Sequence, residues 1–250
     1  MDNGITRGRK RSLEDRIYRT PLIRIVAIFS AAAVALFALA AIIFLICGGR
    51  LITSQTDGVT SRYFGLVWGD VPVLGTFRCT DGSGGSISGD RVRFKDGSTY
   101  EGGLKLLSFE GEGTFTDKYG NEYIGHFANG KQTGGGFVNY ADGSKFGGQF
   151  SEGLFEGYGE MTYADGSVYK GYFSKGERSG YGEFTYADGS WYKGYFEHDM
   201  RHGEGQYRFA SGDTYTGSFK NNLMSGFGTY FFASGRVFSG EFVAGVPKIA

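Results

Sequence analysis

One residue pattern recurs at a fixed interval through most of this chain and limits what the chain can fold into. An aromatic residue stands at every twenty-third position between 100 and 238: Tyr100, Tyr123, Phe146, Tyr169, Tyr192, Tyr215 and Phe238. Glycine follows each of these by two residues, and a second apolar residue follows by four. A strict period of about 20 to 50 residues is typical of arrays in which each copy is one supersecondary unit that packs on its neighbours.

The spacing inside each copy predicts an antiparallel β-hairpin. In the copy that begins at Tyr169, Gly171 and Phe173 follow at intervals of two, which is the period of a β-strand. A Gly-x-Gly pair and then Phe184 supply the second strand. The residues between these positions, such as Lys170, are mostly polar. We therefore expect each hairpin to have one apolar face and one solvated face.

The glycine content explains how such a sheet can be a single layer. The chain holds 45 glycines in 250 residues, with 3 prolines and 17% aromatic residues, a composition that excludes collagen, a proline-rich linker and a disordered chain. A sheet without a second layer must bury its aromatic rings along its own surface. Glycine leaves a flat place for a neighbouring ring, whereas a Cβ atom would push that ring away.

Turn residues stand at both ends of the expected hairpins. Asp-Gly pairs begin at Asp96, Asp142, Asp165 and Asp188. Asp-Gly is a strong hairpin signal because both residues tolerate a positive φ. The opposite turn holds glycine, Asp199 or Asn222 at one repeat position, and these residue types accept a left-handed conformation best. Leu107 occupies that position in the first copy, so we expect its turn to differ.

The pattern Tyr-x-Gly-x-Phe, followed by Gly-x-Gly and Asp-Gly, resembles the MORN repeat (membrane occupation and recognition nexus). The resemblance covers about residues 94–243, with six full copies, a leading half copy and a trailing strand. It implies a twisted antiparallel meander, and about 14 strands at ~4.7 Å each predict a length of roughly 65 Å. It also implies an interaction or membrane-association module, because MORN arrays generally serve in those roles.

A long apolar segment precedes the repeats. Ile25–Ile46 is a run of 22 residues in which every residue except Ser30 is apolar. As a helix this run would be ~33 Å long, enough to cross a ~30 Å hydrocarbon core. A cleavable signal peptide is the alternative, but its apolar region is normally about 7–15 residues long. We therefore predict an all-β fold, an elongated single-layer antiparallel meander of 23-residue hairpin repeats, preceded by one N-terminal transmembrane helix.

The distribution of charge predicts the orientation of this anchor. Residues 1–24 hold seven Lys/Arg and three acidic residues, a net of +4, whereas the remainder of the chain carries −4. Only Arg50 and Arg62 lie close behind the apolar run. By the positive-inside rule, we expect a single-pass membrane protein with a cytoplasmic N-terminus and an extracytoplasmic repeat domain.

These features divide the chain into four segments: a basic cytoplasmic tail at 1–24, a transmembrane helix at 25–47, a tether and N-terminal cap at 48–91, and the MORN-repeat array at 92–250. Gly48–Ser61 is interpreted as the tether. Tyr63–Phe77 either caps the first repeat or rests on the membrane interface. The two cysteines, Cys47 and Cys79, provide no disulfide framework and leave either free thiols or an intermolecular Cys79 bridge.

The sequence contains no recognisable catalytic or cofactor motif. A P-loop and a dinucleotide fingerprint are absent, and the many Gly-x-Gly pairs belong to the repeat. His198 and His202 have the His-x-x-x-His spacing of a metal site, but they straddle a hairpin turn and are better explained as solvated turn residues. His126 lies on the expected polar face without an evident partner. We expect a protein that is not an enzyme and that has no cofactor, no metal and no nucleic-acid partner.

Aromatic and cationic side chains of two adjacent copies are the candidate ligand-binding residues: Tyr169, Tyr172, Tyr192, Tyr195, Lys170 and Lys193. For Tyr169 and Tyr192 the competing interpretation is packing within the sheet, whereas Tyr172 and Tyr195 fall on the opposite face. The two lysines share a repeat position with Glu101, and such a column of charged residues is more often just a solvated face than a binding stripe.

Together the patterns favour a membrane-anchored scaffold that presents an aromatic-lined β surface to a protein or peptide. The alternative is binding of lipid or cell-wall glycan by the repeat array. The net charge of −4 disfavours anionic lipid. Aromatic repeats that bind cell walls are rich in tryptophan, and this chain has only Trp68 and Trp191. Association of several copies of the chain into a homo-oligomer is compatible with these patterns.

Overall fold

The computed structural model describes residues 49–56, 59–69 and 71–248. The chain divides into two compact units, Met1–Arg50 and Leu51–Ala250, and the second unit contains the repeats. Secondary structure in the described residues consists of β-strands and turns. The predicted transmembrane segment, Ile25–Ile46, lies outside the described residues. Within the described part of the chain, no helix has the length and apolar character needed to cross a bilayer.

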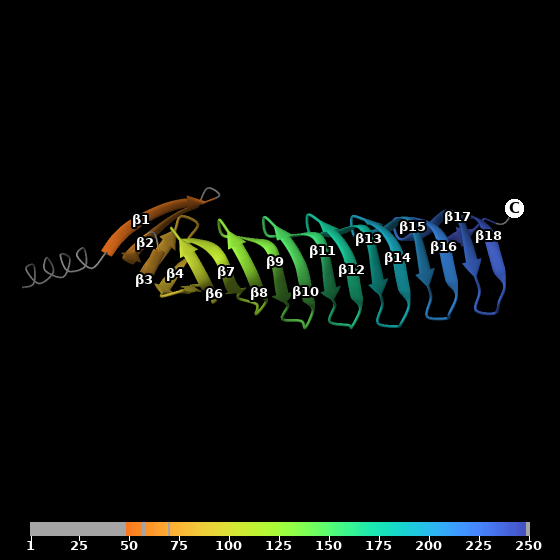
Figure 1. Ribbon diagram of the computed structural model, residues 1–250, viewed down its shortest axis with the longest axis horizontal. Helices are drawn as coiled ribbons and strands as arrows, with labels where there is room; N and C mark the ends of the chain where they lie inside the picture. Colours follow the sequence, from red (N-terminus) through yellow and green to blue (C-terminus); the bar gives the residue numbers. More distant parts are fainter. Residues whose placement is uncertain (1–48, 57–58, 70, 249–250) are drawn as a thin grey trace, which may run out of the picture. The chain divides into compact units, whose positions relative to one another are not determined.

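The strands form one open antiparallel sheet of 19 strands. From β2 to β19, each strand pairs with the strands before and after it in the chain, so the sheet is a meander (Figure 1). The strands are β1 (Gly49–Thr56), β2 (Val59–Trp68), β3 (Val71–Cys79), β4 (Gly84–Ser88), β5 (Arg91–Phe94), β6 (Thr99–Lys105), β7 (Ser108–Thr116), β8 (Glu122–Ala128), β9 (Lys131–Asn139), β10 (Lys145–Ser151), β11 (Leu154–Thr162), β12 (Val168–Ser174), β13 (Glu177–Thr185), β14 (Trp191–Glu197), β15 (Met200–Arg208), β16 (Thr214–Lys220), β17 (Leu223–Phe231), β18 (Val237–Val243) and β19 (Val246–Pro247).

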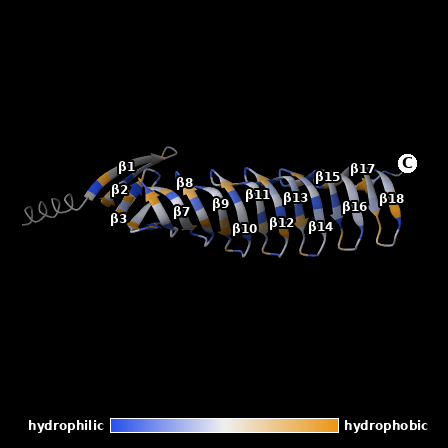
Figure 2. Cartoon of the chain, in the orientation of Figure 1, coloured by the Kyte–Doolittle hydropathy of each residue, from blue (hydrophilic) through white to orange (hydrophobic). Residues whose placement is uncertain are grey.

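Each 23-residue copy supplies one hairpin of a seven-residue strand and a nine-residue strand, as in β12 and β13. The same lengths recur from β6 to β17. Hydrophilic, neutral and hydrophobic residues are mixed along these strands (Figure 2), whereas burial alternates from residue to residue, as in β12 and β14. The predicted all-β meander of hairpin repeats is therefore confirmed for the described residues.

The core is a ladder of aromatic rings on one face of the sheet. The ring of Tyr169 is fully buried and meets Phe173 of its own strand edge-to-face, with centroids 5.1 Å apart. It meets Phe196 of the next copy in the same way, also at 5.1 Å. Tyr192 repeats both contacts with Phe196 and Phe219. Edge-to-face packing is favourable for aromatic rings, and here it links every hairpin to the next.

Paired glycines provide the surface on which each ring lies. Gly171 and Gly182 are register partners beneath Tyr169. A Cβ atom added to Gly171 would lie 2.6 Å from the Cα of Gly182 and 2.7 Å from Cζ of Tyr169. Neither approach is sterically possible without movement, so the glycines are required by the ring above them.

A tyrosine hydroxyl satisfies the backbone at a bulge in most first strands. The register of β12 on β13 shifts between Gly171 and Phe173, which leaves Tyr172 without a register partner on β13. The hydroxyl of Tyr169 donates to the carbonyl oxygen of Tyr172 at 2.9 Å. Equivalent hydrogen bonds join residues three apart in other copies: Tyr100 to Gly103, Tyr192 to Tyr195 and Tyr215 to Ser218. Phe146 lacks the hydroxyl that would make this bond.

The Asp-Gly ends of the hairpins use a turn in which only glycine is left-handed. Gly166 has a φ of 87°, whereas Asp165 does not have a positive φ. The aspartate instead accepts a hydrogen bond at Oδ1 from the backbone N–H of Ser167, at 2.8 Å. The aspartate of this motif therefore contributes as a hydrogen-bond acceptor for the turn backbone and does not adopt a left-handed conformation.

The opposite ends use turns in which both central residues are left-handed, as at Lys175 (φ 51°) and Gly176 (φ 90°). This is the conformation whose twist matches that of a hairpin. Leu106 (φ 47°) and Leu107 (φ 71°) adopt it as well, so the expectation of a different first turn was wrong. Leu107 packs against the aromatic core, and this contact offsets the strain of a left-handed leucine.

Strands also occupy most of the segment for which a tether and a cap were expected. β1 begins at Gly49, and β2 alternates buried Tyr63, Gly65 and Val67 with more exposed neighbours. Alternation of this kind is the strand period, which explains why this segment joins the sheet instead of forming an irregular tether. β5 pairs with β6, so the first strand of the first full repeat is not an open edge.

Candidate functional site

Four tyrosines stand together on the solvated face of the middle repeats, and we name this group the tyrosine face: Tyr158, Tyr172, Tyr181 and Tyr195. They come from four consecutive strands, β11 to β14. Strand alternation points them away from the aromatic core, and each side chain is between 47% and 56% exposed. About half of the surface of each tyrosine residue is thus accessible to a partner.

The four rings form two cross-strand pairs. Tyr158 is the register partner of Tyr172, and their ring centroids lie 5.6 Å apart in an edge-to-face arrangement. Tyr181 and Tyr195 repeat the pair one copy later, at 5.8 Å. Because each ring restrains its partner, little rotamer freedom remains to be lost when a ligand binds.

Ion pairs flank the tyrosine pairs in the neighbouring row of the same face. The Nζ atom of Lys170 lies 3.0 Å from Oε2 of Glu160, and Lys193 lies 3.0 Å from Glu183. The two lysines predicted as ligand-binding residues are therefore paired across strands. These salt bridges are exposed and add little stability, but within this row each lysine charge is matched by a carboxylate.

Adjacent copies do not continue the tyrosine face. The positions equivalent to Tyr158 and Tyr172 hold Glu112 and His126 two copies earlier, and these side chains pair at 2.7 Å. His126 therefore has a partner, contrary to the expectation from the sequence. One copy after the tyrosine face, Glu204 accepts a hydrogen bond from Ser218 at the same positions. The tyrosine face is thus confined to two copies.

A hollow of about 530 Å³ adjoins the tyrosine face on strands β9 to β11. Gly135 and Gly147 leave its floor without side chains, and Phe137, which is 64% exposed, forms one wall. Gln149 and Glu160 line it as well. The hollow extends the accessible apolar surface beyond the four tyrosines.

The remaining predicted ligand-binding residues, Tyr169 and Tyr192, lie on the other face of the sheet. Both are fully buried in the aromatic core. Burial raises the pKa of both phenols above the ordinary value, against a smaller lowering by Arg178 and Arg201. The structure thus separates Tyr172, Tyr195 and the two lysines from these core tyrosines.

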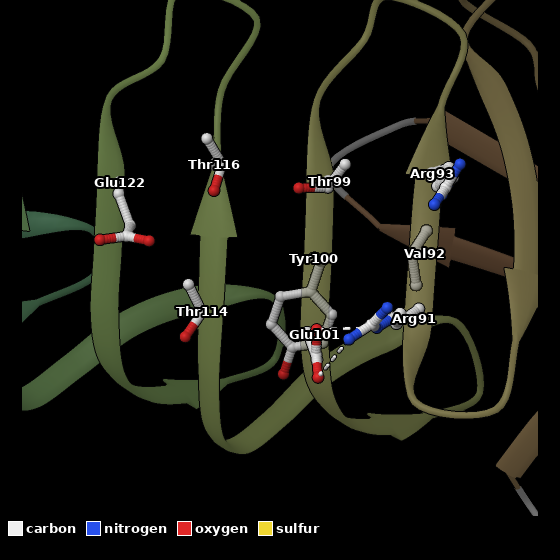
Figure 3. A pocket seen from close by; sticks show the side chains of 9 residues that line it. All are labelled: Arg91, Val92, Arg93, Thr99, Tyr100, Glu101, Thr114, Thr116 and Glu122. Atoms are coloured by element: carbon white, nitrogen blue, oxygen red, sulfur yellow. Dashed lines mark hydrogen bonds and ion pairs between the residues drawn. The ribbon is translucent and has the colours of Figure 1, made fainter. Parts of the chain in front are cut away.

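A second hollow of about 530 Å³ is polar and lies on strands β5 to β8 (Figure 3). Arg91 and Glu101 form an ion pair on its wall, with 2.8 Å between Nε and Oε2. The hydrogen bond to Glu101 raises the pKa of Arg91. Val92, Arg93, Tyr100, three threonines and Glu122 complete the lining, so this hollow offers mainly hydrogen-bonding groups in place of exposed rings.

The histidines do not converge on one point. Nδ1 of His198 lies 2.8 Å from Glu177, whereas Nδ1 of His202 lies 3.4 Å from Glu197. In the described part of the chain, no three His, Cys, Asp or Glu side chains are grouped so that they could hold a metal ion.

Fold and repeat together define an all-β repeat protein built from hairpins with an aromatic core on one face. The MORN repeat family model matches residues 123–145, 148–168, 169–191, 192–214 and 215–235. Residues 123–235 therefore carry five repeats of the MORN family. No curated protein matches it.

Solved structures with matching stretches include two TCP domains. The wild-type TCP10 domain of Danio rerio CPAP, in complex with a peptide of Danio rerio STIL, is 13% identical, with a TM-score of 0.41 over 77% of this chain and 84% of that one. The SAS-4 (dCPAP) TCP domain of Drosophila melanogaster, in complex with a proline-rich motif of Ana2 (dSTIL), is 13% identical, with a TM-score of 0.31 over 76% and 88% of the two chains.

Proposed function

We propose that this protein is a membrane-anchored scaffold whose tyrosine face binds an extended peptide segment of a partner protein. The observation that carries the proposal is the paired exposure of four tyrosines on two adjacent copies. Tyrosine is enriched at binding surfaces because its ring gives a large contact area with few rotatable bonds, and its hydroxyl can hydrogen-bond. The flanking Lys–Glu pairs favour an uncharged occupant.

The spacing of the two tyrosine pairs fits a polyproline II segment that runs across the strands. The pairs lie two strands apart, and two strand spacings amount to ~9.5 Å. A polyproline II helix rises ~3.1 Å per residue with three residues per turn, or ~9.3 Å per turn. Equivalent side chains on successive turns would therefore meet equivalent tyrosine pairs. Aromatic-lined grooves are a known way to bind such segments.

Decaproline is a direct probe of this fit, because it forms a polyproline II helix in water. We expect binding to the full-length protein by titration calorimetry, and Tyr172→Ala and Tyr195→Ala should each weaken it about ten-fold or more. The matched control is Tyr119→Ala, because Tyr119 is 71% exposed but lies in a turn away from the tyrosine face. A flexible Gly-Ser peptide of equal length should not bind.

Equal effects of all three substitutions would count against the proposed site. An oligosaccharide such as a chitin fragment tests the alternative ligand class in the same titration. If that oligosaccharide binds, if Tyr172→Ala abolishes its binding, and if decaproline does not bind, then the tyrosine face is a glycan site and the peptide proposal is wrong.

The anchor and its orientation are part of the proposal. Support comes from the length of the apolar run Ile25–Ile46 and from the basic residues that precede it. A C-terminal tag on the membrane-bound protein should be cut by protease only from the non-cytoplasmic side, with a detergent-lysed sample as the control. Cleavage only from the cytoplasmic side would reverse the orientation and move the search for partners to the cytoplasm.

A further inference from the structure

Four cationic side chains gather on the solvated face of the first strands, and we name them the arginine cluster: Arg62, Arg78, Arg93 and Lys95. All four are exposed. Arg62 on β2 stands directly opposite Arg78 on β3. Gly84 is the partner of Arg78 on the next strand, and its carbonyl accepts a hydrogen bond from the backbone of Lys95. Arg62, Arg78 and Lys95 therefore share one row across the sheet.

Two adjoining hollows lie along this row, with volumes of about 420 and 360 Å³. Both are lined by Thr76 and Arg78. The first hollow also has Arg62 on its wall, and the second has Arg93 and Ser86. No acidic side chain lines either hollow, so their polar surface consists of guanidinium, ammonium, hydroxyl and thiol groups together with the backbone.

Nearby carboxylates are engaged elsewhere. Oδ1 of Asp81 accepts a hydrogen bond from the backbone of its own turn at Ser83, 2.8 Å away. Glu101 pairs with Arg91, and Figure 3 shows this contact on β5 while Arg93 of the same strand lies apart from it. Among the described residues, no ion pair joins the arginine cluster to an acidic side chain.

The arrangement is unfavourable for an isolated sheet. Like charges that stand directly opposite each other on antiparallel strands are destabilising, and Arg62 and Arg78 stand in that relation. On the middle repeats the same face pairs each lysine with a glutamate, as at Lys170 and Glu160. The arginine cluster thus lacks the compensation found elsewhere on this face, and an external anion would supply it.

We propose that the arginine cluster binds a phosphate group. Guanidinium groups bind phosphate through two parallel hydrogen bonds, and the hydroxyls of Thr76 and Ser86 add further donors. A phosphate monoester carries a charge of about −1.5 to −2, which matches four cations better than the single charge of a carboxylate. The site lies outside residues 123–235, where the MORN repeats are matched, and is independent of the tyrosine face.

Inorganic phosphate is the probe, titrated calorimetrically into the full-length protein in neutral detergent at constant ionic strength. Arg78→Gln and Arg93→Gln should each weaken binding about ten-fold or more, because each removes charge-assisted hydrogen bonds. Arg91→Gln is the matched control: it removes the same charge from the same strand, but Arg91 is paired with Glu101. It should change the affinity less than about two-fold.

A fold check accompanies these variants. Arg78→Gln removes the repulsion with Arg62, so its thermal midpoint without phosphate should equal or exceed that of the wild type. Lost affinity in a variant of normal stability then reports on the site. If Arg91→Gln weakens phosphate binding as much as the other two substitutions, phosphate is attracted by positive charge in general, and the proposal is overturned. Acetate binding as tightly as phosphate would overturn it as well.

A second arm distinguishes a soluble phosphate compound from a lipid headgroup. Trp68 is 82% exposed on β2, and in Trp191→Phe it is the only tryptophan. In nanodiscs of phosphatidylcholine with phosphatidic acid, a blue shift of Trp68 emission that Arg78→Gln abolishes would identify the headgroup as the source. The same emission in nanodiscs with and without phosphatidic acid, together with binding of inorganic phosphate, would identify a soluble source. Absence of both responses would overturn the proposal.

Discussion

The guanidinium of Arg178 bridges Asp199 of the next hairpin and the aromatic core. Its Nε donates to Oδ1 of Asp199 at 2.9 Å, its Nη2 donates to the carbonyl oxygen of Asp199 at 2.8 Å, and it lies 5.2 Å from the ring centroid of Phe184. One copy later, Arg201 makes the equivalent bond to the carbonyl of Asn222 at 2.8 Å. The buried Nε of Arg201 has no acceptor among the described residues.

Exchanging the two acceptors tests what the carboxylate contributes. Asp199→Asn should lower the free energy of unfolding by about 1 kcal/mol, because a charged acceptor is replaced by a neutral one. Asn222→Asp should raise it by a similar amount, because Arg201 then gains the partner that Arg178 already has. Both positions are left-handed, and Asn and Asp tolerate that conformation equally. Urea unfolding measures both, and equal midpoints for all three proteins would refute the assignment.

Gly171→Val should destabilise the protein far more than Lys170→Val. The added Cβ at Gly171 would collide with the ring of Tyr169 and the backbone of Gly182, and overpacking of this kind costs about 1–3 kcal/mol or more. Lys170 is exposed and loses only its salt bridge to Glu160, worth about 1 kcal/mol at most. Thermal midpoints of the two variants provide the comparison. Equal midpoints would contradict the assignment of the two faces.

The bulge carbonyl provides a paired test in two copies. Tyr169→Phe should lower stability by about 1–3 kcal/mol, since it leaves the carbonyl of Tyr172 without its donor. Phe146→Tyr should raise stability by about 0.5–1.5 kcal/mol, because β10 has the same register shift and the new hydroxyl can reach Gln149. Denaturant unfolding of each variant measures the change. If Phe146→Tyr destabilises, the ring of that copy does not have the room that the other copies provide.

Stability should depend on pH through His198. The hydrogen bond and charge of Glu177 raise the pKa of His198 above its ordinary value. A pKa that is higher in the folded state means that the charged imidazole stabilises the fold below about pH 6.5, the ordinary value, and that this contribution is lost as the pH rises through the raised pKa. The midpoint difference between wild type and His198→Gln should therefore be larger at pH 6 than at pH 9. In a Glu177→Gln background this dependence should become smaller, because Glu177 contributes most to the raised pKa of His198.

The faces of the sheet could be read from the sequence because they follow from strand alternation alone. Residues two apart share a face, so the burial of Tyr169 and the exposure of Tyr172 follow directly from the position of the strand. The glycine positions are equally predictable, because a single layer gives its rings no other place to lie. The Asp-Gly turns were located correctly, although the aspartate acts there as a hydrogen-bond acceptor.

The contacts between strands could not be read in this way, because they depend on register. Tyr158 and Tyr181 each stand between two glycines of the repeat and were not among the predicted ligand-binding residues. Only the pairing of β11 with β12 shows that Tyr158 meets Tyr172. Glu112 and His126 are 14 residues apart and become partners for the same reason. The sequence did contain a signal for these two exposed tyrosines: each is an aromatic residue at the middle position of Gly-x-Gly, which strand alternation places on the solvated face.

The meander also sets how the two proposed sites are separated. Because each repeat strand bonds only with its neighbours in the chain, folding can start at any hairpin and spread to both sides. Insertion or loss of one complete copy between β6 and β9 would leave every remaining strand with an equivalent partner. The distance between the arginine cluster and the tyrosine face would change by about 9.5 Å for each copy. The number of hairpins therefore sets the distance between the two sites. Duplication of a copy in the gene could increase that distance without a change in either site.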